Sequence, residues 1–357
     1  MNSKRIINLD IIRVLAMLMV VVMHTLYNFT LRTDFFNTKL WFIFEPIIAL
    51  SKTCVLLFFM LSGYLVVNKK RSVKENWKRT KKRILVPLLS FSLLNMFYEL
   101  YKFNFEKRSV GEFIQRQMVR ITDFPSSPLW FLVALFYFYL LNPVWGKIFN
   151  NKESKNIAIY ITKMSLMLSI VSTLVKFPGM KEHTLFNNFT GWIGYLFFYF
   201  YGALAKNKWV NVYNKRINYL LITFGFLFTF IGDYITSFTT AKNINFVWTN
   251  YTGNFLSFPV VMLSIGVFNL LLAGSFKSFG LLFKKIIEWF AGVSFGIYLI
   301  HTFIVSFLTD ILRFRFDNLS MNVYLYNIIN FSIVFIASTI IAYVLKITPK
   351  LKALVGE

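Results

Sequence analysis

Three ionisable residues lie within the first long apolar run of this chain. Residues 6–29 are otherwise hydrophobic enough to cross a bilayer, yet they include Asp10, Arg13 and His24. Ionisable groups at membrane depth are costly, and they usually face a protein interior or a water-filled cavity. On an α-helix, eleven residues turn through about 1100°, three turns plus roughly 20°, and rise about 16 Å. Arg13 and His24 therefore share one helix face at two depths, and Asp10 lies on nearly the same stripe.

A later apolar run carries a second set of polar groups. Ser294, Tyr298 and His301 fall within about 60° of one another on a helical wheel. His301 could serve only as a hydrogen-bonding partner between helices. However, His24 and His301 are two histidines at comparable depth, and this favours one hydrated cavity that both side chains face and that opens towards Arg83.

The run over residues 41–67 contains Lys52 near its middle and the pair Ser62-Gly63 near its end. Small residues let membrane helices approach closely, so the serine–glycine pair could serve packing alone. A lysine near mid-membrane is harder to explain by packing. We therefore expect Lys52 and Ser62 to border the same polar space as the two histidines.

The composition excludes a soluble domain. Hydrophobic residues make up 57% of the chain, aromatic residues 19% and charged residues only 15%, whereas a soluble domain has about 25% charged residues. The net charge of +24 could indicate nucleic-acid binding, but the basic residues occur in short loops between apolar runs, so no nucleic-acid partner is expected. Cys54 is the only cysteine, which excludes a disulfide framework. The first run contains charges and lacks a small-x-small cleavage site, so it is predicted to be a retained helix and not a signal peptide.

About ten apolar runs are each near the roughly 20 residues that a membrane-spanning helix needs. The sequence therefore predicts an all-α, polytopic integral membrane protein with a single domain over residues 1–357. Lys and Arg are concentrated in alternate loops, on the side that also holds the N-terminus. This bias predicts that both chain ends are cytoplasmic. The predicted spans cover residues 6–29, 41–67, 84–103, 129–149, 157–175, 190–205, 217–237, 251–273, 286–309 and 322–345.

The densest basic cluster lies in the loop over residues 68–83, which closes in Lys81, Lys82 and Arg83. One interpretation is an anchor that touches anionic lipid headgroups. Another is a phosphate-binding patch at the mouth of the cavity, since arginine makes bidentate phosphate contacts and lysine binds phosphate as a point charge. The two interpretations are compatible.

Several short motifs follow one another along most of the chain. They are Leu9-Asp10-x-x-Arg13, His24 after ten further residues, Phe58-Phe59-x-x-Ser62-Gly63-Tyr64, the basic run to Arg83 with Pro87, Leu129-Trp130-Phe131-Leu132 with Tyr139 and Pro143, and Ser294-x-Gly296-x-Tyr298-Leu299-x-His301.

Taken together and in this order, these motifs resemble the acyltransferase-3 family of integral membrane O-acyltransferases, particularly the bacterial surface-polysaccharide O-acetyltransferases. One departure is Pro128, which stands where members often have a histidine before the leucine–tryptophan pair. Some relatives append an extracellular hydrolase-like domain, and none is expected here because the sequence stops at Glu357.

The resemblance implies transfer of an acyl group, usually acetyl from acetyl-CoA, to a hydroxyl of a cell-surface polysaccharide or its lipid-linked precursor at the cell membrane. Acyl-CoA would be a co-substrate, with no permanently bound cofactor. His24 would be the general base or a transient acyl carrier, with His301 beside it. Tyr298, Ser62 or Arg13 could donate hydrogen bonds to the developing oxyanion.

A CoA molecule entering from the cytoplasm would leave its phosphates near Arg13 and the basic loop, and its pantetheine arm would extend towards His24. Asp10 would orient or neutralise Arg13. The scattered histidines and the lone cysteine predict no metal site, and His183, in an outer loop, needs no special role. Two other classes are a transporter or flippase for a lipid-linked glycan, whose charges would line a substrate path, and a non-catalytic scaffold, which has no use for the buried charges.

Overall fold

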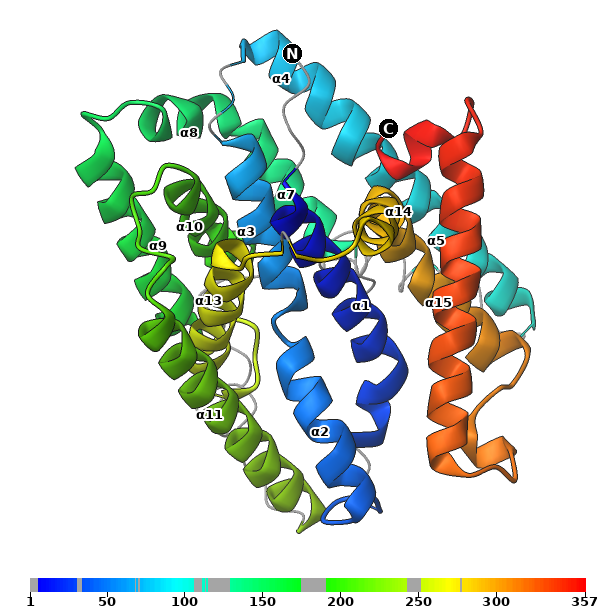
Figure 1. The fold of residues 1–357 in the computed structure, drawn as a ribbon. Coiled ribbons are helices and arrows are strands. Elements are labelled where there is room, and N and C mark those ends of the chain that lie inside the picture. The colour runs from blue at the N-terminus through cyan, green and yellow to red at the C-terminus, as the bar shows by residue number, and fades with distance from the viewer. Residues whose placement is uncertain are drawn as a thin grey trace.

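A computed structural model describes residues 6–30, 34–67, 69, 71–105, 111–112, 114, 129–174, 191–242, 252–276 and 278–357. Over these residues the protein is a bundle of helices without a strand (Figure 1). Six of the described helices are long and apolar enough to cross a membrane, or seven if one bent pair counts as a single span. The prediction of an all-α polytopic membrane protein is thus confirmed, whereas the number ten and the cytoplasmic location of both ends stay predictions.

The predicted spans fall on helices. The helices of 20 residues or more are α1 (Ile7–Thr30), α5 (Val86–Phe105), α9 (Lys155–Leu174), α11 (Lys215–Ala241), α14 (Leu281–Ser306) and α15 (Val323–Ile347). All of these except α9 belong to the six candidate spans, and the sixth is the run over Lys39–Val66. Two predicted spans correspond to helices shorter than a bilayer crossing, α10 (Leu196–Lys206) and α13 (Phe258–Ala273). Short 3-10 segments precede α10 (η2, Gly191–Tyr195) and α15 (η4, Phe316–Asn318).

Three predicted spans differ in shape from single helices. The run over 41–67 divides into α2 (Lys39–Ser51) and α3 (Cys54–Val66). The run over 129–149 bends by 60° between α7 (Trp130–Leu140) and α8 (Asn142–Phe149), where Pro143 stands in the first turn of α8. The third span begins earlier than predicted, because α4 (Val73–Thr80) and the π-helical turn η1 (Lys81–Leu85) lead directly into α5.

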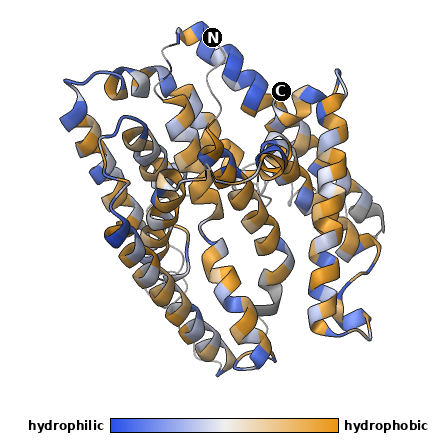
Figure 2. Cartoon of the chain, in the orientation of Figure 1, coloured by the Kyte–Doolittle hydropathy of each residue, from blue (hydrophilic) through white to orange (hydrophobic). Residues whose placement is uncertain are grey.

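Helix α1 lies in the middle of the bundle and contacts α2, α3, α13, α14 and α15 (Figure 1). Its apolar residues belong to one large core shared with these helices. The hydrophilic residues gather at helix ends and above all on α4, which lies across one end of the bundle (Figure 2). A reciprocal capping box between Ser72 and Glu75 starts α4, and the Asn76 side chain donates to the Tyr139 carbonyl and so fixes α4 to α7.

Two glycines set the close approach of α3 and α10. A Cβ on Gly63 would lie 1.8 Å from the Tyr199 carbonyl oxygen, and one on Gly202 would lie 1.9 Å from the Met60 carbonyl oxygen. Only residues without a Cβ let the two backbones touch in this way. The packing interpretation of the Ser62-Gly63 pair therefore holds for Gly63.

We expect Gly63→Val to lower the melting temperature and the amount of protein in the membrane, because the added side chain must push α10 away. Gly280→Ala is the matched control, since no atom lies within 4 Å of the position that its Cβ would take. Thermal melting of the purified variants measures both effects. Wild-type stability of Gly63→Val would contradict the close α3–α10 contact.

Candidate functional site

A cavity of about 380 Å³ opens among α1, α3, η1, α7, α14 and α15. Four of the polar candidate residues line it: Arg13, Ser62, Arg83 and Ser294. Four further residues of the quoted motifs also line it: Phe58, Phe131, Tyr139 and Gly296. Its other charged lining residues were not singled out: Lys69, Arg79, Lys346 and Glu357. The cavity is therefore strongly cationic.

Arg13 and Asp10 are adjacent in this wall. Arg13 Nη1 donates to Asp10 Oδ1 at 3.3 Å across one helical turn. Asp10 is only 4% exposed, whereas 29% of the Arg13 side chain is accessible. Asp10 thus lies where it can orient Arg13 and still leave the guanidinium open to the cavity.

The α4–η1 segment presents some of its basic residues to the cavity and turns others away. Arg79 and Arg83 line the cavity, while Lys81 and Lys82 are exposed and do not. The reason is helical spacing, because residues four apart share a face and the two lysines between them point elsewhere. Of the three residues that close the basic loop, only Arg83 therefore lines the cavity, and Arg79 lines it as well.

The cations at this end of the cavity lack enough acceptors. Within the described part of the chain, the buried Arg71 Nη1 and Arg79 Nε have no hydrogen-bond partner. Burial, followed by the charges of neighbouring cations, lowers the pKa of Lys69; the largest of these charge effects comes from Arg79. Buried donors without acceptors carry a free-energy penalty, and an anion in the cavity would remove it for Arg79, which lines the cavity.

The two membrane-embedded histidines are neighbours. The rings of His24 on α1 and His301 on α14 have centroids 5.0 Å apart. His301 is fully buried and His24 is exposed. His301 Nδ1 lies 3.3 Å from the Ile297 carbonyl oxygen, and the buried Nε2 has no partner among the described residues. If Nδ1 carries the proton and donates to that carbonyl, Nε2 presents a lone pair.

An aromatic wall separates the histidine pair from the cationic cavity. The Tyr298 ring lies 5.9 Å from His301, 5.3 Å from Phe131 and 6.0 Å from Phe58. Phe58 and Phe131 line the cavity, whereas neither histidine does. Tyr298 packs edge to face against Phe58 and Phe131 and also contacts His301, so its ring lies between the cavity lining and the histidine pair. One connected pocket from Arg83 to both histidines stays a prediction.

Lys52 does not line the cationic cavity. Its Nζ lies 2.5 Å from Asp233 Oδ2 on α11, and each of the two side chains is only 6% exposed. Gly253 covers the pair, since a Cβ there would lie 2.5 Å from Asp233 Oδ1 and 2.7 Å from Lys52 Nζ. Lys52, which was expected to border the polar space of the two histidines, instead forms a buried ion pair that ties the α2–α3 break to α11.

We expect Lys52→Met and Asp233→Leu each to lower the melting temperature markedly, because either change leaves a buried charge without its partner. The double variant should recover most of the loss, since apolar side chains of similar volume can replace a buried ion pair. Thermal unfolding of the three variants provides the measurement. A double variant less stable than both single variants would contradict this explanation.

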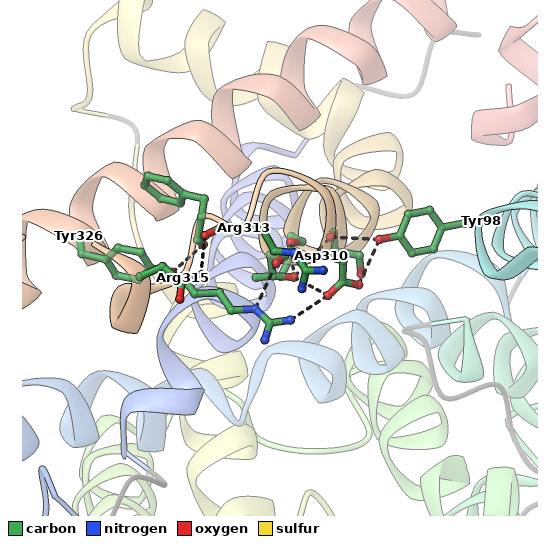
Figure 3. Close-up of polar contacts among 10 residues, drawn as sticks. Tyr98, Asp310, Arg313, Arg315 and Tyr326 are labelled. Carbon is green, nitrogen blue, oxygen red and sulfur yellow. Dashed lines mark hydrogen bonds and ion pairs between the residues drawn. The ribbon is translucent and has the colours of Figure 1, made fainter. Parts of the chain in front are cut away.

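A second polar cluster joins α5 to the end of α14, at the π-helical turn η3 (Phe307–Ile311) (Figure 3). The Tyr98 hydroxyl lies 3.1 Å from Asp310 Oδ2, and Arg315 Nη2 lies 3.2 Å from Asp310 Oδ1. Sequence reasoning did not find this cluster, because its members are far apart in the chain and none interrupts a motif. It contains no residue of the cationic cavity or of the histidine pair.

His183 and Pro128 lie outside the described residues. Over the described residues, no group of three or more His, Cys, Asp or Glu side chains could hold a metal ion.

Comparison with known proteins gives one match. A family model described as an acyltransferase domain, acyltransferase-3, matches residues 6–347. No curated protein and no solved structure matches the chain.

Proposed function

Because the chain belongs to the acyltransferase-3 family and is a multi-pass membrane acyltransferase, we propose that it moves an acetyl group from acetyl-CoA to a hydroxyl of a cell-surface polysaccharide or its lipid-linked precursor. The observation that carries this proposal is a cationic cavity that lies one aromatic layer away from the pair formed by the exposed His24 and the buried His301. The cavity suits a phosphorylated donor, and the histidines suit proton transfer from a hydroxyl.

The donor's phosphates bind in the cationic cavity. Arg79 and Arg83 supply planar donor groups for phosphate oxygens, and Arg13 adds a third guanidinium deeper along α1. The apolar lining from Phe58 and Phe131 suits the thin pantetheine arm. For the thioester to reach the histidines, the Tyr298, Phe58 and Phe131 rings must separate, so the aromatic wall acts as a gate between the donor and the acceptor side.

At the histidine pair the acceptor hydroxyl loses its proton to a ring nitrogen and its oxygen attacks the thioester carbonyl. The carbon–sulfur bond then breaks, the ester forms and the proton passes to the departing CoA sulfur, so that free CoA leaves. Histidine suits both proton transfers because its ordinary pKa is near neutrality. His24, which is exposed, meets the acceptor, and His301 Nε2 lies behind it as a second acceptor of the proton. Transfer through a short-lived acyl-His24 intermediate is the other route to the same products.

Deleting the gene and profiling the cell-surface polysaccharide by NMR tests the function. We expect the loss of one O-acetyl ester signal, its return with the wild-type gene and no return with a His24→Ala gene that gives the same amount of protein. An unchanged ester profile together with accumulated lipid-linked glycan would instead support the glycan transporter.

A further inference from the structure

The segment that follows α15 forms part of the cavity wall. The 3-10 turn η5 (Lys352–Val355) packs against η1, α5, α14 and α15, and Val355, Gly356 and Glu357 line the cavity. Gly356 has a φ of +76°, and a Cβ there would lie 3.1 Å from the Arg83 carbonyl oxygen and 3.2 Å from the Phe295 ring. A glycine at this position therefore lets the segment lie directly against η1 and α14.

Lys346, in the last turn of α15, is held by this segment. Its Nζ donates to the Gly292 carbonyl oxygen at 2.7 Å and lies 3.1 Å from Glu357 Oε1. A Cβ on Gly292 would lie 2.7 Å from Nζ, so glycine makes the room into which the ammonium group fits. An ammonium group has three donors, and these two contacts leave one for a ligand.

The charges around the cavity are unequal. The lining residues of the described chain include five cations and a single carboxylate, that of Glu357; the cations are Arg13, Lys69, Arg79, Arg83 and Lys346. The Glu357 side chain is 44% exposed and that of Lys346 is 30% exposed. Exposed ion pairs are weak, so a doubly charged phosphate can displace Glu357 from Lys346.

We propose that Lys346 is a further ligand of the donor's phosphates. The Glu357 carboxylate pairs with the Lys346 ammonium group until a phosphate displaces this carboxylate. This inference rests on the proposed function, since it assumes a phosphorylated donor in the cationic cavity. The exchange makes the site specific for ligands with enough negative charge to displace a carboxylate.

The experiment measures CoA affinity by calorimetry on the full chain in lipid nanodiscs. We expect Glu357→Gln to lower the dissociation constant about three- to tenfold and Lys346→Gln to raise it about tenfold. The double variant should match Lys346→Gln alone, because Glu357 acts only through Lys346. Glu153→Gln, an exposed carboxylate away from the cavity, is the matched control and should leave the affinity unchanged.

Three results would overturn the inference. If Glu357→Gln binds CoA no more tightly than the wild type, the segment after α15 lines the cavity but does not compete with the phosphates. If Glu357→Gln tightens binding as much when Lys346 is also replaced, Glu357 acts as a distant charge and the exchange does not occur. If the wild type binds no CoA, the proposed function fails and the inference fails with it. In the first two cases the proposed function would still stand if an Arg79→Gln/Arg83→Gln variant bound CoA more weakly than the wild type.

Discussion

Replacing His24 by alanine or glutamine should abolish acyl transfer while the protein still inserts and accumulates at the wild-type level. Loss of a general base typically costs about 10²–10⁴-fold in rate, and loss of an acyl carrier removes the reaction altogether. His301→Ala should give a similar loss, because its ring centroid lies 5.0 Å from that of His24. The double variant should be no worse than the single variants if the two rings act as one unit.

The measurement is acetyl-CoA turnover together with polysaccharide ester content in membranes that contain equal amounts of each variant. Matched melting temperatures exclude loss of folding as the cause. Transfer above about a tenth of the wild-type rate in His24→Ala would exclude the base role, since it falls short of the usual loss.

The second large effect concerns donor binding. Replacing Arg79 and Arg83 together by glutamine should raise the KM for acetyl-CoA by about a hundredfold or more, because each of the two charged hydrogen bonds to phosphate contributes roughly 1.5–3 kcal/mol. The matched control is Lys81→Gln/Lys82→Gln, which removes the same charge from the same segment but from side chains that do not line the cavity. It should leave the KM nearly unchanged.

Salt gives an independent test of the same site. Added salt should raise the KM of the wild type more than that of the Arg79→Gln/Arg83→Gln variant, because screening weakens the attraction between the cavity and the phosphates. Equal effects of the two double substitutions on KM would mean that the basic residues serve only membrane topology.

The helical bundle could be predicted from the sequence because hydrophobic length and residue periodicity determine which segments cross a bilayer. The break after Ser51 could not, because Lys52 at this break pairs with Asp233, which is 181 residues away. The bend between α7 and α8 does have a local signal, since Pro143 stands in the first turn of α8.

Part of the candidate site could also be predicted, because helix periodicity shows which side chains share a face. Equal depth and shared helix faces indicated that His24 and His301 are neighbours. The i,i+4 spacing of Arg79 and Arg83 was a further signal in the sequence, because residues four apart share a helix face and both of these line the cavity. The aromatic wall at Tyr298 was not predictable, because ring packing between three helices leaves no periodic pattern. Lys346 was likewise indistinguishable from an ordinary basic residue at a helix end.

We infer that this chain itself transfers acetyl groups from CoA to a glycan hydroxyl by way of the histidine pair. The most direct measurement supplies purified protein in proteoliposomes with radiolabelled acetyl-CoA and with polysaccharide from the deletion strain, and counts the alkali-labile label on the glycan. We expect labelled glycan with the wild type and background counts with His24→Ala. Equal labelling with both proteins, or none with a wild type that is folded and binds CoA, would contradict this inference.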